Sequence, residues 1–160
     1  MPPNPVVAAA IVDSLEHPTL LLAAERSYPK SLAGMFELPG GKIDGDEDAE
    51  DALFREIREE LGVNMILGNP VPATTAALTK MMEEERAIPA NGPEFAPWPI
   101  LQDRVMWVWF AELVPGEKEQ MLGSHQSLVW TSPKEALDLP WLPTNIPIVE
   151  ACIAEIRASH

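Results

Sequence analysis

The order of apolar and polar residues along the chain predicts short strands interleaved with a few helices. Apolar runs and alternating patterns favour extended structure at residues 6–12, 19–24, 35–38, 73–78, 104–113 and 128–131. Helical spacing of apolar residues occurs at residues 48–61, 133–137 and 147–158. Strands mixed with few helices predict an α/β protein with a mixed sheet. Because no repeat or linker interrupts these elements, we expect one domain over residues 1–160.

The closing helix is predicted to bury one face against the rest of the domain. That face consists of apolar residues at helical spacing, namely Ile148, Val149, Cys152, Ile153 and Ile156. Cys152 is the single cysteine, so the chain cannot form an internal disulfide and an inert core thiol is expected.

The segment from Lys80 to Asp103 changes in composition. It holds four prolines and a tandem acidic run and shows no clean periodicity. Long loops inside compact domains are commonly functional or disordered. We expect a proline-rich loop insertion over residues 80–103, which is either a mobile surface loop or a lid over a substrate.

The chain of 160 residues carries 25 acidic and 11 basic side chains, a formal net charge of −14. Nucleic-acid polymers and anionic membranes are bound by basic surfaces, so neither is an expected partner. The N-terminus has prolines and no basic segment, and no apolar run is long enough to span a bilayer. These features predict a cytoplasmic protein, and they leave its oligomeric state open.

The acidic residues are concentrated around the helix predicted over residues 48–61. Asp48 is suited to its N-cap and Gly62 to its C′ position, after a turn predicted at Gly40 and Gly41. This helix carries three carboxylates, Glu56, Glu59 and Glu60. By helical geometry one of them faces the apolar stripe, and the other two lie at the edge of that stripe. Arg55 and Arg58 are expected to project away from them. Three clustered carboxylates predict a site for a hard divalent cation, Mg²⁺ or Mn²⁺.

The same residues resemble a known signature. Gly41, Glu47 and the run Arg55-Glu56-Ile57-Arg58-Glu59-Glu60-Leu61-Gly62-Val63 reproduce the Nudix box, G-x5-E-x7-R-E-U-x-E-E-x-G-U, where U is a bulky aliphatic residue. The chain is thereby identified as a member of the Nudix superfamily. The resemblance implies a Nudix-type α/β/α sandwich with a mixed central sheet, and an enzyme that hydrolyses a nucleoside diphosphate linked to another group.

The resemblance also implies roles for the box residues. Glu56, Glu59 and Glu60 would be metal ligands together with the Gly40 carbonyl, and Mg²⁺ would be the cofactor, with Mn²⁺ as a substitute. Glu47 would orient Arg55 or assist the attacking water. The expected catalytic set is therefore Glu47, Arg55, Glu56 and Glu59, and the general base stays unassigned among the glutamates.

The segment AERSYPKSLAGMFELPGGK resembles the MutT-like branch, whose members hydrolyse nucleoside triphosphates to monophosphate and pyrophosphate. By that resemblance Arg26 and Lys42 would bind phosphates, and Glu37 would be a structural or metal-proximal carboxylate. Asn145 falls where this branch places its base-reading residue. Its amide suits 8-oxo-(d)GTP, and the alternative substrate is (d)CTP or a 5-substituted cytosine nucleotide. Asn145 could equally act as an N-cap for the closing helix.

One position departs from the pattern. Relatives often carry a metal-binding Glu six residues before the tryptophan that matches Trp130, and here that residue is Ser124. Glu117, Glu119 and His125 are candidates to replace it. A nucleotide-binding module without catalysis is the remaining alternative to an enzyme.

Overall fold

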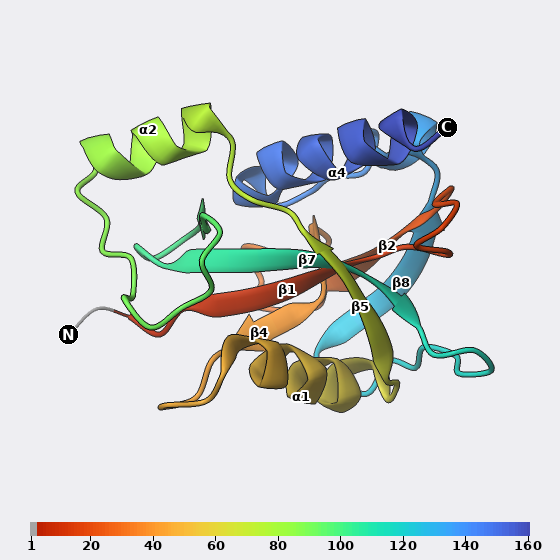
Figure 1. Ribbon diagram of the computed structural model, residues 1–160. Coiled ribbons are helices and arrows are strands. Elements are labelled where there is room, and N and C mark those ends of the chain that lie inside the picture. Colours follow the sequence, from red (N-terminus) through yellow and green to blue (C-terminus); the bar gives the residue numbers. More distant parts are fainter. Residues whose placement is uncertain (1–2) are drawn as a thin grey trace.

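The computed structural model describes residues 3–160 as a layered arrangement of strands and helices (Figure 1). The strands are β1 (Val6–Ile11), β2 (Leu21–Arg26), β3 (Phe36–Glu37), β4 (Gly40–Lys42), β5 (Met65–Pro70), β6 (Trp98–Pro99), β7 (Val105–Leu113) and β8 (His125–Thr131). The helices are α1 (Ala49–Leu61), α2 (Thr75–Glu83), α3 (Pro133–Ala136) and α4 (Ile146–Ala158), and a 3₁₀ turn, η1 (Pro143–Asn145), leads into α4.

The strands form two sheets. In the larger sheet the order is β4-β1-β7-β5, with β6 also paired to β7. Strands β1 and β7 are parallel, from Val6 opposite Met106 to Ile11 opposite Ala111, and the other pairs in this sheet are antiparallel. The smaller sheet is antiparallel in the order β3-β2-β8. The mixed sheet predicted from the sequence is confirmed.

Strand β1 supplies both hydrophobic cores. Successive side chains of a strand point to opposite faces. Val7, Ala9 and Ile11 accordingly belong to the core that contains the apolar stripe of α1. Ala8 and Ala10 belong to the core beneath α4. Figure 1 shows α1 on one side of the larger sheet and α2 and α4 on the other, which is the expected α/β/α layering.

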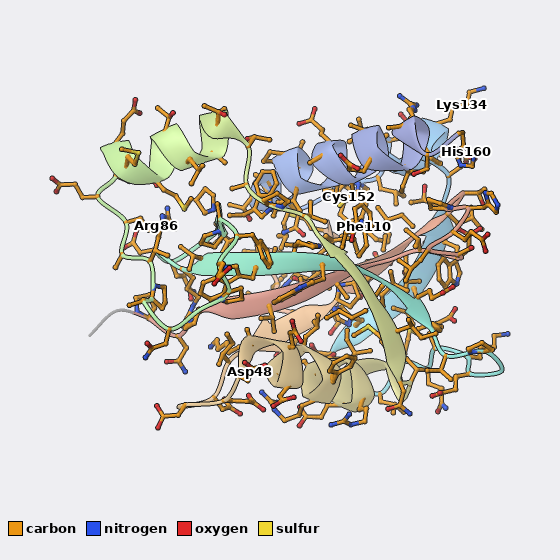
Figure 2. The ribbon with its side chains drawn as sticks, in the orientation of Figure 1. Asp48, Arg86, Phe110, Lys134, Cys152 and His160 are labelled. Carbon is orange, nitrogen blue, oxygen red and sulfur yellow. The ribbon has the colours of Figure 1, made fainter. Side chains whose placement is uncertain are left out.

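The helix ends agree with the sequence signals. Asp48 is the N-cap of α1 and its carboxylate accepts the Glu50 N–H at 3.1 Å. Gly62 ends the helix in the left-handed region at φ 68°, where an L side chain would be strained. The five apolar residues predicted for the inner face of the closing helix are all buried, and Figure 2 shows Cys152 on the side of α4 that faces the strands.

Two local predictions are wrong. Residues 73–78 were expected to be extended, but Thr75–Glu83 is a helix because the Thr74 hydroxyl caps it by accepting the Ala77 N–H at 3.2 Å. Gly40 and Gly41 were expected in a turn, yet they lie in strand β4 paired with β1. Strand β5 was not predicted, since its sequence MILGNP lacks a clear alternation.

The segment predicted as a loop over residues 80–103 contains regular structure at both ends. Helix α2 continues to Glu83, and Trp98 and Pro99 form β6. Arg86 connects the middle of the segment to its end, because its Nη1 donates to the carbonyls of Ile100 and Arg104 at 2.7 Å each. Among residues 3–160, no helix combines the length and apolar character needed to cross a membrane.

Candidate active site

A cavity of about 600 Å³ lies where β1, β3 and β4 meet α1, β8 and η1. Its volume is in the range of pockets that enclose small-molecule ligands. The sequence-predicted residues that line it are Arg26, Glu37, Gly40, Lys42, Glu56, Glu60 and Asn145. Glu47, Arg55 and Glu59 are outside the lining. Arg104 and Met106 also line the cavity, and no motif in the sequence marks either residue.

The three carboxylates of α1 differ in exposure. Side-chain exposure is 14% for Glu56, 21% for Glu60 and 59% for Glu59. Burial raises the pKa of Glu56, and the charges of Glu59 and Glu60 add to that effect, although the guanidinium of Arg55 opposes it. Glu56 therefore presents its charge to the cavity at a cost that a cation would relieve.

Arg55 is the counter-ion of this acidic cluster. Its Nη1 donates to Glu56 at 3.1 Å and to Glu59 at 3.2 Å, and its Nε and Nη2 both donate to Glu47. These hydrogen bonds lower the pKa of Glu47 and raise that of Arg55. The expectation that Arg55 projects away from the carboxylates is wrong. The helical angle fixes the direction of Cβ, and the long side chain folds back along the helix surface.

The acidic side chains at the cavity have the chemistry of a hard-cation site, because they offer only oxygen donors. Glu60 Oε2 is buried and has no hydrogen-bond partner among the described residues. Within residues 3–160 no three acidic, histidine or cysteine side chains already stand together as a preformed metal site, and Arg55 instead holds Glu56 and Glu59. The donors fit a divalent cation such as Mg²⁺, with Glu56 and Glu60 as the α1 carboxylates that reach the cavity.

A side chain at either glycine of β4 would collide with its surroundings. A Cβ on Gly40 would lie 2.0 Å from the Val7 carbonyl oxygen, so the pairing with β1 excludes any side chain there. A Cβ on Gly41 would lie 2.2 Å from the Glu56 carboxylate. The strand therefore approaches α1 closely enough to place its backbone beside the acidic cluster.

A second group of polar side chains, Arg26, Glu37 and His125, also lines the cavity. Arg26 Nη1 donates to Glu37 Oε1 at 3.0 Å, and the other Glu37 oxygen is 2.9 Å from His125 Nε2. His125 Nδ1 in turn lies 3.4 Å from Glu60 Oε2. Lys42 is exposed at the rim and its carbonyl accepts Arg55 Nη2 at 3.1 Å.

The substitutes considered for the carboxylate absent at Ser124 lie in different places. Glu117 accepts the Asn64 backbone N–H at 2.9 Å, and Glu119 accepts Trp130 Nε1 at 2.8 Å. Neither residue lines the cavity, whereas Ser124 and His125 do. Of the three candidates, His125 alone contacts a carboxylate of the predicted metal set in the described structure.

Asn145 is 5% exposed and lies at the end of η1. Its Oδ1 accepts the Leu38 backbone N–H at 3.1 Å. It occupies the N-cap position of α4, but its side chain makes no capping hydrogen bond. Asn145 is therefore the N-cap residue of α4 by position, as the alternative predicted, but its side chain does not cap the helix, because Oδ1 accepts the Leu38 N–H instead.

Comparison with known proteins agrees with this arrangement. Residues 2–152 match the NUDIX domain family, and the chain belongs to that family of hydrolases. Within the family its relatives are MutT-like Nudix hydrolases, and the resemblance found in the sequence is confirmed. Nudix hydrolases generally use divalent metal ions.

Three relatives illustrate the similarity. The chain is 32% identical to the CTP pyrophosphohydrolase of Escherichia coli K12, over 96% of this chain and 94% of that protein. It is 31% identical to the putative 8-oxo-dGTP diphosphatase 2 of Mycobacterium tuberculosis CDC 1551, over 88% of this chain and 81% of that protein. The crystal structure of a MutT Nudix hydrolase from Burkholderia pseudomallei aligns with a TM-score of 0.64 at 25% identity, covering 94% of this chain and 98% of that chain.

Proposed function

We propose that this protein is a Mg²⁺-dependent pyrophosphohydrolase that cleaves 8-oxo-(d)GTP to the monophosphate and pyrophosphate. The observation that carries the proposal is one cavity that joins carboxylates of α1 to the buried amide of Asn145. Such a cavity can hold the phosphates of a nucleotide at one end and its base at the other.

At the phosphate end, Glu56, Glu59 and Glu60 would hold the divalent cation together with the Gly40 carbonyl. When bound, the cation supplies positive charge that neutralises the polyphosphate and activates water for substitution at phosphorus. Arg55 keeps Glu56 and Glu59 on one side of α1, and Glu47 fixes Arg55 in turn. The general base is left unassigned among the glutamates.

Arg26 and Lys42 supply the cationic side chains for the phosphate oxygens. Both line the cavity, and guanidinium and ammonium groups bind phosphate through charge-assisted hydrogen bonds. Glu37 restrains Arg26 through its 3.0 Å ion pair. This restraint lowers the entropy that the arginine side chain loses when substrate binds.

At the base end, the orientation of the Asn145 amide is fixed. A backbone N–H must be accepted by Oδ1, so the Leu38 hydrogen bond leaves Nδ2 as the donor end of the side chain. Oxidised guanine presents the O6 acceptor beside the N7–H donor. Nδ2 can donate to O6 while the second lone pair of Oδ1 accepts N7–H, which favours the oxidised base over guanine.

A cytosine nucleotide is the second candidate substrate. The observation in its favour is the 32% identity, over 96% of this chain, to a protein named CTP pyrophosphohydrolase. The donor end of Asn145 can also meet O2 or N3 of cytosine, so the amide alone does not exclude that base.

A panel of 8-oxo-dGTP, dGTP, dCTP and CTP, assayed with Mg²⁺ and after chelation, tests the proposal. We expect hydrolysis that requires Mg²⁺ and the highest kcat/KM for 8-oxo-dGTP. Preference for CTP would select the second candidate, and tight binding without turnover of any nucleotide would indicate a non-catalytic module. Glu59→Gln is the inactive control, with a large loss of kcat and an unchanged fold.

A further inference from the structure

His125 is the first residue of β8 and its side chain is only 5% exposed. It lies between two carboxylates from different parts of the fold, Glu37 on β3 and Glu60 on α1. A buried imidazole placed between two acidic groups is an expensive arrangement unless its nitrogens interact with them.

The two ring nitrogens face different partners. Nε2 is 2.9 Å from Glu37 Oε2, and Glu37 continues to Arg26 through a 3.0 Å ion pair. Nδ1 is 3.4 Å from Glu60 Oε2, and neither of these two buried atoms makes a hydrogen bond in the described part of the chain. The ring therefore stands between the proposed phosphate-binding arginine and a proposed metal ligand.

The segment before β8 fixes this ring against α1. Gln120 N–H donates to the Leu61 carbonyl at 2.8 Å, and Leu122 N–H donates to the Glu60 carbonyl at 3.0 Å. A Cβ on Gly123 would lie 1.8 Å from Glu60 Oε2, so a side chain at this position would displace that carboxylate. Two backbone hydrogen bonds and the close approach of Gly123 thus hold the segment before His125 against the end of α1.

We propose that His125 is a positioning residue that links Glu60 to Glu37, and through Glu37 to Arg26. By this link it orients the metal-binding carboxylate of Glu60 and the phosphate-binding guanidinium together, at a site where Ser124 supplies no carboxylate. The inference rests on the proposed function, because it concerns the same metal and triphosphate.

Two conservative variants distinguish the contact of His125 with Glu60 from its contact with Glu37. The Asn amide nitrogen is as many bonds from the backbone as His Nδ1, and the Gln amide nitrogen is as many bonds away as Nε2. His125→Asn should therefore keep a donor for Glu60 and lose the contact with Glu37. His125→Gln should keep a donor for Glu37 and lose the contact with Glu60, and His125→Ala should lose both.

The readouts are the Mn²⁺ affinity of the metal-free protein, measured by titration calorimetry, and the KM for the triphosphate at saturating metal. Loss of a residue that orients a metal ligand weakens metal binding by about 10–100-fold. We expect that loss in His125→Ala and His125→Gln, with Asn restoring the affinity. We expect KM to rise about tenfold in His125→Ala and His125→Asn, with Gln restoring it.

His17→Ala, which removes an exposed histidine away from the cavity, is the matched control. The proposal is overturned if His125→Ala leaves both quantities within about twofold of wild type, or if Asn and Gln behave alike. If the wild type hydrolyses no nucleotide, the proposed function fails, while the Mn²⁺ affinities still decide whether His125 orients Glu60.

Discussion

Arg55 and Glu47 form a two-point ion pair, with Nε to Oε2 at 2.8 Å and Nη2 to Oε1 at 2.9 Å. This parallel pair fixes the plane of the guanidinium. The remaining nitrogen, Nη1, is thereby directed at Glu56 and Glu59. One arginine thus provides the positive charge that the acidic face of α1 needs in the metal-free protein.

The geometry of this pair predicts that Arg55→Lys is not conservative. Lysine keeps the charge, but it lacks the planar guanidinium that donates to Glu47 and to the helix carboxylates at once. We expect kcat to fall about 10–100-fold, as for other residues that orient metal ligands, and Tm to fall by about 2–4 °C. Steady-state kinetics measures kcat, and thermal unfolding measures Tm. Arg58→Lys, at an exposed position one turn along α1, is the matched control and should leave them unchanged.

Glu56→Gln should increase stability while it removes activity. Burial raises the pKa of Glu56, so its charge is unfavourable in the metal-free fold. Neutral glutamine of the same shape avoids that cost but is a poor ligand for a hard cation. We expect a higher Tm without metal and a kcat lowered by more than about 100-fold. A metal-free Tm below that of wild type would contradict this account of the acidic cluster.

Proton competition at Glu56 predicts the pH dependence of metal activation. The carboxylate must be deprotonated to bind a cation, and its pKa lies above the usual 4.5. Because the pKa of Glu56 is raised in the folded state, protonation of Glu56 stabilises the fold at low pH. This stabilisation is lost as the pH rises through the folded-state pKa. The half-saturating metal concentration should therefore increase as pH falls from about 7 towards about 5. The Tm advantage of Glu56→Gln should shrink over the same range.

Asn145→Asp tests base recognition. A carboxylate can still accept the Leu38 N–H, but it has lost the Nδ2 donor and gained an acceptor for the exocyclic amine of cytosine. We expect the ratio of kcat/KM for 8-oxo-dGTP over CTP to fall by about tenfold or more. Asn145→Ala should lower kcat/KM for both nucleotides without reversing the preference between them. An unchanged ratio in Asn145→Asp would show that Asn145 does not read the base.

Cys152 should not react in the native protein. The thiol is fully buried beneath α4, and burial raises its pKa to about 12, so the reactive thiolate is scarce at neutral pH. A thiol reagent should label Cys152 only after denaturant unfolds the chain. Rapid labelling under native conditions would mean that α4 opens locally.

The parts of the site that the sequence predicts are those specified by neighbouring residues. The caps, apolar stripe and carboxylates of α1 all follow from residues within a few turns of one another. The Leu38–Asn145 and Glu37–His125 contacts join residues 107 and 88 positions apart, and no local pattern encodes such pairing. Helix α2 differs from the predicted strand because a short apolar run such as residues 76–78 does not distinguish strand from helix, and the threonines before it favour strands.

Strand β1 carries none of the reactive groups, yet its alternating side chains divide the enzyme into two independent halves. Val7, Ala9 and Ile11 support the helix that holds the acidic box. Ala8 and Ala10 face the layer of α4, at whose start Asn145 meets the cavity. Under the proposed function, residues on the α4 side can be exchanged to change the base preference while the acidic box on α1 is kept. On that proposal, the separation is a physical reason why relatives named for CTP and for 8-oxo-dGTP share a single fold.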